Sequence, residues 1–402
     1  MERPGPVRIH LVAAVITELN QHKEAIGNGG FSFSALGPRR THVGIEILCN
    51  AATMKITLFT RADFQESADR APIREGISMT KLRYIAAITV SLVFFSSTSQ
   101  AWFSFGHMAV AYVAYQKLTP EKKLRVAALL KKNPYYATKW KALIPAGTPA
   151  DQQDLMLFMI AATWPDEIKS DPAYNLPDGP AGGNRPPTDG TQWLNQGYGD
   201  LHRHKYWHFI DTPFSQDGTS LVAIPTTNAE TEIAVCRQTL TLVPASKKDA
   251  KKIDQLKSYD LVWLLHLVGD VHQPLHATTR VSSADTNGDD GGNSVKLNDP
   301  SKELHAFWDG LPGDSNDLTQ VINYAKALAP ADPALAQKTD AADWISESFD
   351  LARNVVYSGP IGPGRGPFTL TDDYKNQAHK IADARVELAG ERLANLINNE
   401  LK

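Results

Sequence analysis

An apolar segment of the chain, LVWLLHLVGDVHQPLHATTR at residues 261–280, contains side chains that can bind a metal ion or move a proton. His266 and Asp270 lie four residues apart, so in a helix both project from one face, and His276 follows just after a proline. The surrounding leucines and valines make that face apolar. An imidazole or a carboxylate buried there must be paired, hydrogen-bonded or bound to a metal. A single buried His–Asp hydrogen bond that orients one helix is the simpler alternative.

A second pair with the same spacing, His305 and Asp309, occurs in ELHAFWDG. Three more candidates stand in apolar or aromatic settings: His107 in WFSFGHMAV, Asp166 in TWPDEIK and His208 in KYWHFIDTP. Each alone is compatible with a packed or hydrogen-bonded side chain, but their number favours a metal centre. Because the chain has only two cysteines, the ligands must be His and carboxylates, and Zn²⁺ is the metal we expect.

Helices joined by long loops are expected to position these side chains, and the predicted fold class is all-α. Thr119 followed by Pro120 predicts a helix start, and Asp151 is expected to cap another helix. Helical spacing of apolar residues predicts helices at 106–118, 121–132, 151–170, 227–243, 254–274, 340–356 and 372–401. Strand patterns are few, NSVKL at 293–297 being the best. Residues 171–200, rich in proline and glycine, are expected to form a loop.

Length, composition and charge limit the class of protein. The 402 residues are 42% hydrophobic and include 8 tryptophans, enough for a sizeable core. The net charge is −3, and the sequence has no basic tail or evident Lys/Arg stripe. It therefore does not indicate a positively charged surface for binding duplex DNA. Cys49 and Cys236 are the only cysteines, which argues against a disulfide framework and excludes a thiolate metal site.

A secretory signal peptide is expected at residues 79–101. Met79 is followed by two basic residues, a 12-residue apolar run and small residues up to Ala101. The run is shorter than the ~20 residues that span a bilayer, and a core helix is the alternative. We expect translation to begin at Met79, so that residues 1–78 are a misplaced-start extension without a domain. The mature chain would be one domain, 102–402, secreted or periplasmic.

The motifs occur in the order W-x4-H, W-x-D, H-F-I-D-x-P, H-x3-D-x5-H, G-G-N and L-H-x2-W-D, from Trp102 onward. This order resembles the zinc-dependent single-strand nucleases and 3′-nucleotidases, the family of the fungal S-one and P-one enzymes. That family is related to the trinuclear-zinc phospholipases C. The resemblance covers the chain to its end and implies a helical domain with three zinc ions in a cleft. It also implies hydrolysis of single-stranded RNA and DNA, and of nucleoside 3′-monophosphates, leaving 5′-phosphates.

The resemblance implies a ligand set for each zinc ion. The first zinc would take four side chains, Asp166, His208, His266 and Asp270. The second zinc would take three, His276, His305 and Asp309. The third would take the free α-amine and carbonyl of Trp102, together with His107 and Asp270. Asp270 would therefore bridge two metals, and the free amine requires cleavage after Ala101.

The implied reaction is attack of an activated hydroxide on phosphorus. A water that bridges two Zn²⁺ ions can lose its proton near pH ~7, and the third zinc can stabilise the leaving 3′-oxyanion. By the resemblance, Asp166 also orients this water and Lys169 contacts the phosphate. An ordinary solvated lysine is the alternative for Lys169.

The resemblance also implies a pocket in which a base is stacked and hydrogen-bonded, formed by Phe209, Asp211 and Asn293. Asp211 has an alternative role in turning the chain before Pro213. His272 lies between ligands but fits no ligand position, and we interpret it as structural.

Two departures from the family pattern concern the rim of the cleft and its crosslinks. Forty-one residues separate Asp166 from His208, longer than expected in the fungal enzymes, and this Pro/Gly-rich insertion is expected at the rim. The disulfides of fungal and plant members cannot form, because Cys236 is alone in the mature chain. The rim affects substrate preference rather than the metal chemistry.

A phospholipase C on the same scaffold is the alternative function, and a non-catalytic zinc-binding protein is a third. Asp309 stands where those lipases are expected to have Glu, and the HFID and GGN motifs suit a base. Structural zinc sites are closed, whereas ligand positions left open for water argue for catalysis. We expect a monomer whose partners are nucleic acid and nucleotide substrates, with no membrane contact after signal removal.

Overall fold

Helices form most of the regular structure in the computed structural model, which describes residues 30–36, 42–49, 54–60, 102–176 and 197–402. The chain divides into two compact units, Met1–Ser97 and Thr98–Lys402. The predicted signal peptide lies outside the described residues.

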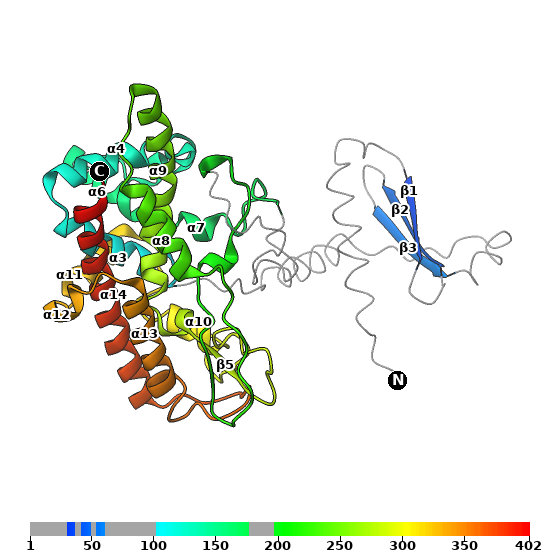
Figure 1. Ribbon diagram of the computed structural model, residues 1–402. Coiled ribbons are helices and arrows are strands. Elements are labelled where there is room, and N and C mark those ends of the chain that lie inside the picture. Colours follow the sequence, from blue (N-terminus) through cyan, green and yellow to red (C-terminus); the bar gives the residue numbers. More distant parts are fainter. Residues whose placement is uncertain (1–29, 37–41, 50–53, 61–101, 177–196) are drawn as a thin grey trace. The chain divides into compact units, whose positions relative to one another are not determined.

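The first unit contains a three-stranded antiparallel sheet in the order β1-β2-β3 (Figure 1). Its strands are β1 (Gly30–Leu36), β2 (His42–Cys49) and β3 (Met54–Thr60). Gly30 is opposite Leu48, and Val43 is opposite Thr60. The sequence analysis recognised no strand pattern in this part of the chain, and the origin of residues 1–78 stays a prediction.

The second unit is mostly helical, which confirms the predicted fold class. Its α-helices are α3 (Ser104–Lys117), α4 (Pro120–Leu130), α5 (Lys141–Leu143), α6 (Ala150–Ala161), α7 (Trp164–Glu167), α8 (Ala229–Leu240), α9 (Lys247–Asp270), α10 (Leu304–Asp309), α11 (Leu318–Ala327), α12 (Pro333–Ala336), α13 (Ala341–Leu351) and α14 (Asp372–Glu400). Three short segments are 3-10 helices, η3 (Gly197–Gly199), η4 (Lys205–Trp207) and η5 (Pro274–Ala277), and two are π-helical, η1 (Tyr136–Trp140) and η6 (Ala352–Val356). Two short strands, β4 (Pro213–Ser215) and β5 (Thr279–Val281), pair in parallel.

Local sequence signals explain where several helices begin. The Thr119 hydroxyl accepts a hydrogen bond from the backbone N–H of Lys122 (3.3 Å), with Pro120 in the first turn, as predicted. The predicted cap at Asp151 is wrong, because α6 already begins at Ala150 and Asp151 lies in its first turn. An aspartate in that turn still interacts favourably with the helix dipole.

Proline residues explain where two predicted helices end early. The predicted helix 151–170 is divided into α6 and α7, and Pro165, which has no N–H for an i−4 bond, stands in the first turn of α7. The helix predicted to reach residue 274 ends at Asp270, just before Pro274 opens η5. The predicted strand NSVKL is also wrong: Lys296 and Leu297 form only isolated bridges.

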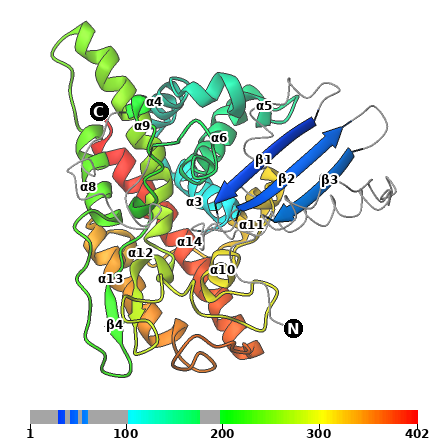
Figure 2. The same cartoon turned by 90° about the vertical axis from the view of Figure 1, so that its right-hand side faces the viewer.

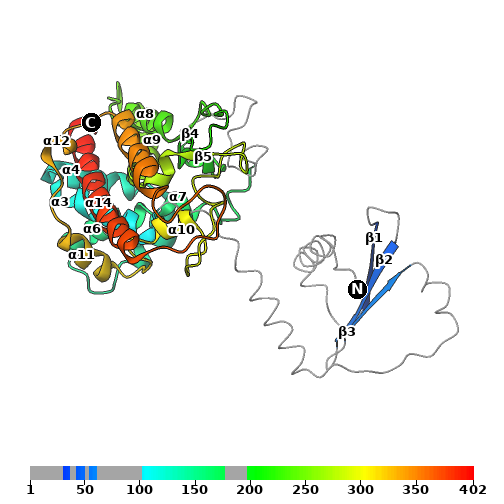
Figure 3. The same ribbon diagram turned by 90° about the horizontal axis from the view of Figure 1, so that it is seen from below.

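Helices α9 and α3 form the centre of the helical unit. The side chains of α9 from Lys257 to Asp270 are all buried, as are those of α3 from Phe105 to Tyr115. A predominantly apolar helix takes such an interior position, and polar residues such as His266 and Asp270 in α9 are buried with it. Helix α14 runs alongside α3 (Figures 2 and 3), and Gly390 permits this approach, because a Cβ there would lie 2.5 Å from the Cβ of Val113.

None of the described helices is both long and apolar enough to cross a membrane.

Candidate metal centre

Six segments far apart in the sequence bring their histidines and aspartates to the buried end of α9. They contribute His107 from α3, Asp166 from α7, His208 after η4, His266 and Asp270 from α9, His276 from η5, and His305 and Asp309 from α10. All eight side chains are buried. Within the described residues, three groups of ligand atoms lie close enough to hold a metal ion, His107–Asp166–His266, His208–His266–Asp270 and His276–His305–Asp309. The predicted ligand side chains therefore do converge.

Four side chains, Asp166, His208, His266 and Asp270, are predicted to bind one zinc, and we call this set the first group. His266 Nε2 lies 3.0 Å from His208 Nδ1, 3.4 Å from Asp270 Oδ2 and 3.5 Å from Asp166 Oδ1. His208 Nδ1 lies 3.0 Å from Asp270 Oδ2 and 3.8 Å from Asp166 Oδ1. His208, His266 and Asp270 therefore lie close enough together to hold one metal ion, and Asp166 lies beside the two histidines.

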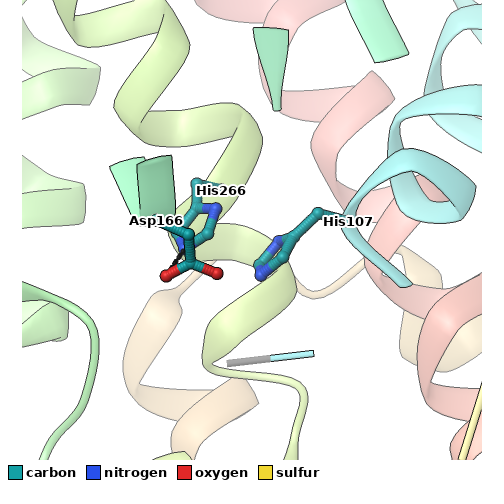
Figure 4. A group of neighbouring side chains, drawn as sticks. All are labelled: His107, Asp166 and His266. Atoms are coloured by element: carbon teal, nitrogen blue, oxygen red, sulfur yellow. Dashed lines mark ion pairs between the residues drawn. The ribbon is translucent and has the colours of Figure 1, made fainter. Parts of the chain in front are cut away.

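Asp270 faces two histidine groups with its two oxygens. While Oδ2 faces the first group, Oδ1 lies 3.3 Å from His107 Nε2. The rings of His107 and His266 stack with centroids 3.7 Å apart, and Figure 4 shows both beside Asp166. This geometry suits the bridging role predicted for Asp270. It also places His107 next to Asp166, a neighbour that the sequence did not predict.

His107 approaches α9 closely because a glycine stands opposite it. A Cβ at Gly269 would lie 2.9 Å from His107 Nδ1. Trp102, at the start of the domain, is buried and donates its indole N–H to the Gly269 carbonyl (3.0 Å). Ala101 lies outside the described residues, so ligation by the Trp102 amine stays a prediction.

The second group consists of His276, His305 and Asp309. The Nε2 atoms of the two histidines are 3.1 Å apart. Asp309 places Oδ2 at 3.3 Å from His305 Nε2 and Oδ1 at 3.9 Å from His276 Nε2. The i, i+4 spacing in α10 puts His305 and Asp309 on one face, as the sequence indicated.

Backbone carbonyls fix the orientation of three of these rings. The Nδ1 of His266 lies 2.8 Å from the Ala162 oxygen, that of His276 lies 2.7 Å from the His208 oxygen, and that of His305 lies 2.7 Å from the Gly291 oxygen. An Nδ1–H that donates to a carbonyl leaves the Nε2 lone pair for a metal. Gln273, which the sequence analysis did not single out, donates from Nε2 to Asp309 Oδ1 (2.6 Å).

Several buried polar atoms of the cluster have no hydrogen-bond partner within the described residues. They include both ring nitrogens of His107, Oδ2 of Asp166 and Oδ1 of Asp270. Burial without a partner costs a polar group several kcal/mol, ~2–7 by most measures. A bound cation would remove this cost, so the donor set fits metal ions.

The pKa shifts of the cluster favour the same conclusion. Burial lowers the pKa of His107, His208 and His276, and it lowers that of His305 to about 4, so these rings are neutral at pH 7. Neutral imidazole is the form that ligates metal. Burial, with the neighbouring Asp166, raises the pKa of Asp270, which indicates that this carboxylate lacks compensating positive charge.

Lys169 is the cation closest to Asp166. Its Nζ lies 2.7 Å from Asp166 Oδ1, and both side chains are buried. Burial alone would raise the pKa of Asp166, but Lys169 and then His266 and His208 hold it well below its usual value. Lys169 is therefore not an ordinary solvated lysine.

The profile of the S1/P1 nuclease family matches residues 102–402. The chain belongs to this family. It is therefore a nuclease, a hydrolase that acts on nucleic acids.

Three curated plant relatives of this S1/P1 nuclease come from Arabidopsis thaliana. Endonuclease 5 is 26% identical over 258 residues, which cover 59% of this chain and 75% of the relative. Endonuclease 4 is 29% identical over 188 residues, 41% of this chain and 58% of the relative. Endonuclease 3 is 24% identical over 323 residues, 74% of this chain and 88% of the relative.

The three residues predicted to bind a base lie at the edge of this nuclease's metal centre. Phe209 directly follows His208 and packs partly against the core. Asp211 and Asn293 are half-buried, and Asn293 donates from Nδ2 to the Asp290 carbonyl (2.6 Å). The segment is tied to η5, because the N–H of residue 210 donates to the His276 carbonyl (2.8 Å). Their role in binding a base stays a prediction.

Two further histidines of the nuclease lie apart from the three ligand groups. His272 is held by the Val268 carbonyl (2.7 Å) and by Arg392 of α14, whose Nη1 lies 2.9 Å from His272 Nε2. This agrees with its interpretation as structural. His204 pairs with Asp200 (2.7 Å) and stacks on a tryptophan, an Asp-x3-His pair that the sequence analysis overlooked in a loop.

Proposed function

We propose that this S1/P1 nuclease is a zinc-dependent enzyme that hydrolyses single-stranded RNA and DNA, and nucleoside 3′-monophosphates, to leave 5′-phosphates. The main support for this proposal is the orientation of the Asp270 carboxylate between histidines on both of its sides. Its Oδ2 faces His208 and His266, whereas its Oδ1 faces His107, an arrangement that suits two metal ions sharing one carboxylate. His276, His305 and Asp309 form a further candidate group, which supports a site for more than one ion.

The donors fit zinc because they are neutral imidazoles and carboxylates without thiolates. Asp166, His208, His266 and Asp270 would hold one ion, and the second group would hold another. His107 and Asp270, with the Trp102 amine, would hold the third. Bound zinc would supply Lewis acidity toward phosphoryl oxygens and lower the pKa of water at the site.

The protein side chains orient the water and balance the phosphate charge. Asp166 Oδ2 is buried without a hydrogen-bond partner among the described residues, so it can accept a hydrogen bond from an attacking water and orient it. The Lys169 ammonium, held beside the other oxygen of Asp166, provides positive charge for an incoming phosphate. Burial of both groups strengthens these interactions by lowering the local dielectric.

Preference for single strands is supported by the surroundings of the centre. Phe209 is half-buried beside His208, so part of its ring is available for stacking. A base can stack on such a ring only when it has left its partner strand. Asp211 and Asn293 are nearby polar groups that could read the edge of that base.

The mature protein is proposed to be a secreted or periplasmic monomer that starts at Trp102. The support is the sequence of residues 79–101 and the match of the family profile, which also begins at Trp102.

The decisive experiment measures hydrolysis of matched single- and double-stranded DNA, RNA and adenosine 3′-monophosphate by protein starting at Trp102. Activity should be highest on single strands, disappear with a chelator and return with Zn²⁺. Phosphatidylcholine serves as the competing substrate. Its hydrolysis without cleavage of polynucleotides would assign a phospholipase C, and metal-independent cleavage would refute the zinc chemistry.

A further inference from the structure

Residues 120–145 have a charge opposite to that of the whole chain. They contain seven Lys or Arg residues and one Glu, in a protein whose net charge is −3. The remainder of the molecule is therefore distinctly acidic. The sequence analysis missed this local excess because it considered the balance of the full chain. Charge asymmetry of this kind is typical of contact with nucleic acid.

Within this stretch, KKNPYYATKWK alternates cationic and aromatic side chains. We define the η1 surface as Lys131, Lys132, Tyr135, Tyr136, Lys139 and Lys141. The side chains of Lys131, Lys132 and Lys139 are 43%, 39% and 48% exposed, and both tyrosines are half-buried. Trp140 is fully buried and anchors the segment in the core. The buried Trp140 therefore holds the segment in place, while the lysine side chains remain exposed to solvent.

The η1 surface borders the metal centre through α7. Lys139 Nζ lies 2.7 Å from an oxygen of Glu167, the residue next to Asp166. The Tyr135 ring packs edge-on against Trp164, with centroids 6.0 Å apart, and its hydroxyl donates to Asp171. Figure 2 shows α5, which follows η1 directly, next to α6.

Among the described residues, no side chain pairs with the polar ends of two members of the surface. Lys131, Lys132 and Lys139 have acidic neighbours, but no described residue pairs with Lys141. The Tyr136 hydroxyl likewise has no hydrogen-bond partner in the part of the chain that the structure describes. An unpaired cation and a half-exposed ring, five residues apart, match the needs of a phosphate and of a base.

We propose that the η1 surface binds single-stranded nucleic acid beyond the bond that is cleaved, with Lys141 on a phosphate and Tyr136 under a base. This inference rests on the proposed function, because it assigns a polynucleotide as substrate. The ion pairs of the other lysines are solvent-exposed and weak, so they exchange readily for backbone phosphates. The surface distinguishes long strands from mononucleotides.

The test compares Tyr136→Ala, Lys141→Gln and their double variant on a long oligothymidylate and on the dinucleotide dTpdT. Loss of stacking should raise KM for the long strand about fivefold for Tyr136→Ala. Lys141→Gln should reduce the salt dependence of log KM by about 0.7 per phosphate contact. The kcat and the hydrolysis of dTpdT should be unchanged. Tyr136→Phe keeps the ring and should behave as wild type, as should Lys326→Gln, which removes an exposed lysine on α11.

Equal losses on both substrates, or an unchanged KM for the long strand, would overturn the proposal. Binding of labelled oligothymidylate, measured by anisotropy in an Asp166→Asn background, separates the two hypotheses. If the wild type cleaves no nucleic acid but Tyr136→Ala still weakens binding, the proposed function fails and the surface stands. If the wild type cleaves DNA while these variants bind like Lys326→Gln, only the surface is refuted.

Discussion

Asp270 shows how much depends on a single carboxylate. It is fully buried at the last position of α9, and its oxygens face His208 and His107 at 3.0 and 3.3 Å. Its burial raises its pKa, so the charged form depends on cations being present. This dependence leads to two predictions at the scale of residues.

Asp270→Asn should remove zinc from two sites together and abolish turnover, because the bridging charge is lost while the shape is kept. His272→Ala, two residues on, is the matched control and should leave zinc content nearly intact, since His272 contacts Arg392 rather than the cluster. Metal analysis of both purified variants measures this. Equal zinc loss in the two would mean that the roles on this segment are misassigned.

Gln273→Leu should weaken zinc binding at the second group by about 10–100-fold, the usual effect of losing a residue that orients a ligand. Gln273 is fully buried and donates to Asp309 Oδ1 (2.6 Å), which fixes the position of that carboxylate. Competitive zinc titration should show one weakened site beside unchanged ones. An unaltered titration would contradict the role given to Gln273.

At this scale, the sequence predicted the side chains that converge but not the groups that orient them. His266 with Asp270, and His305 with Asp309, were visible because helical spacing relates residues four apart. Gln273 was not, because its partner lies 36 residues away and only the fold joins them. A buried amide carries no signature of its own in sequence.

At the scale of elements, α9 and α3 position the centre by direct contact. The contact depends on Gly269, which leaves room for the His107 ring. Helices with long apolar patterns were predicted correctly, whereas their ends were displaced where a proline or an unrecognised cap acts. The Ser246 hydroxyl, for example, caps α9 well before the predicted start.

Gly269→Ala should destabilise the domain by about 1–3 kcal/mol, the usual cost of overpacking a core, and release the zinc at His107. The added Cβ would lie 2.9 Å from His107 Nδ1, so α3 or the ring must shift. Gly199→Ala is the control, because a Cβ there meets no atom within 4 Å. Thermal unfolding and zinc content should change only in the first variant.

Helices α13 and α14 are joined by ion pairs between the half-buried Glu347 and the buried Arg385 and Arg392. Its carboxylate accepts hydrogen bonds from Arg385 (2.9 Å) and Arg392 (2.8 Å). Burial alone would raise the pKa of Glu347, but Arg392 and Arg385 outweigh it and lower the pKa to about 2. The pKa of Glu347 is lower in the folded state than its value of roughly 4.5 in the unfolded chain. The ionised carboxylate therefore stabilises the fold fully at pH values above about 4.5, and this stabilisation is lost as the pH falls toward about 2.

Glu347→Gln should therefore lower stability by about 1–2 kcal/mol at pH 7, because two buried guanidinium groups lose a partly solvent-screened counter-charge. The difference in stability between wild type and variant should narrow as the pH falls from about 4.5 to about 2. Denaturant unfolding at several pH values measures it. A difference that stays constant over this range would show that the carboxylate charge is not the cause.

At the scale of the whole molecule, Trp102, the predicted start of the mature domain, is part of the proposed catalytic site. The fold class and the single helical domain followed from periodicity, because buried helices leave long apolar repeats. The sequence analysis did not recognise the strands β1, β2 and β3. It also predicted a strand at NSVKL, where the structure has only isolated bridges. Strands β1, β2 and β3 are seven or eight residues long and GFSFSAL alternates apolar with small or polar residues at its start, so the pattern was present and was overlooked.

Protein that retains Ala101 should bind one zinc fewer than protein starting at Trp102 and should lose most activity. A backbone amide nitrogen has no available lone pair, so Trp102 can ligate through nitrogen only as a free α-amine. Zinc sites also need several deprotonated donors held together. Zinc per chain and cleavage of single-stranded DNA should be compared for the two proteins. Full zinc content and full activity in the longer protein would refute the amine ligand.

The spacing of the proposed ligands along the chain also affects when, during its synthesis, the enzyme could begin to hydrolyse RNA in the cell. The first ligand side chain, His107, lies on α3, which packs against α14 at the other end of the domain. The last, Asp309, follows some two hundred residues later. Domains fold as units once their chain has emerged from the ribosome. We therefore expect a nascent chain to complete the proposed metal centre only after α14 has been synthesised, which would delay hydrolysis until the chain is nearly finished.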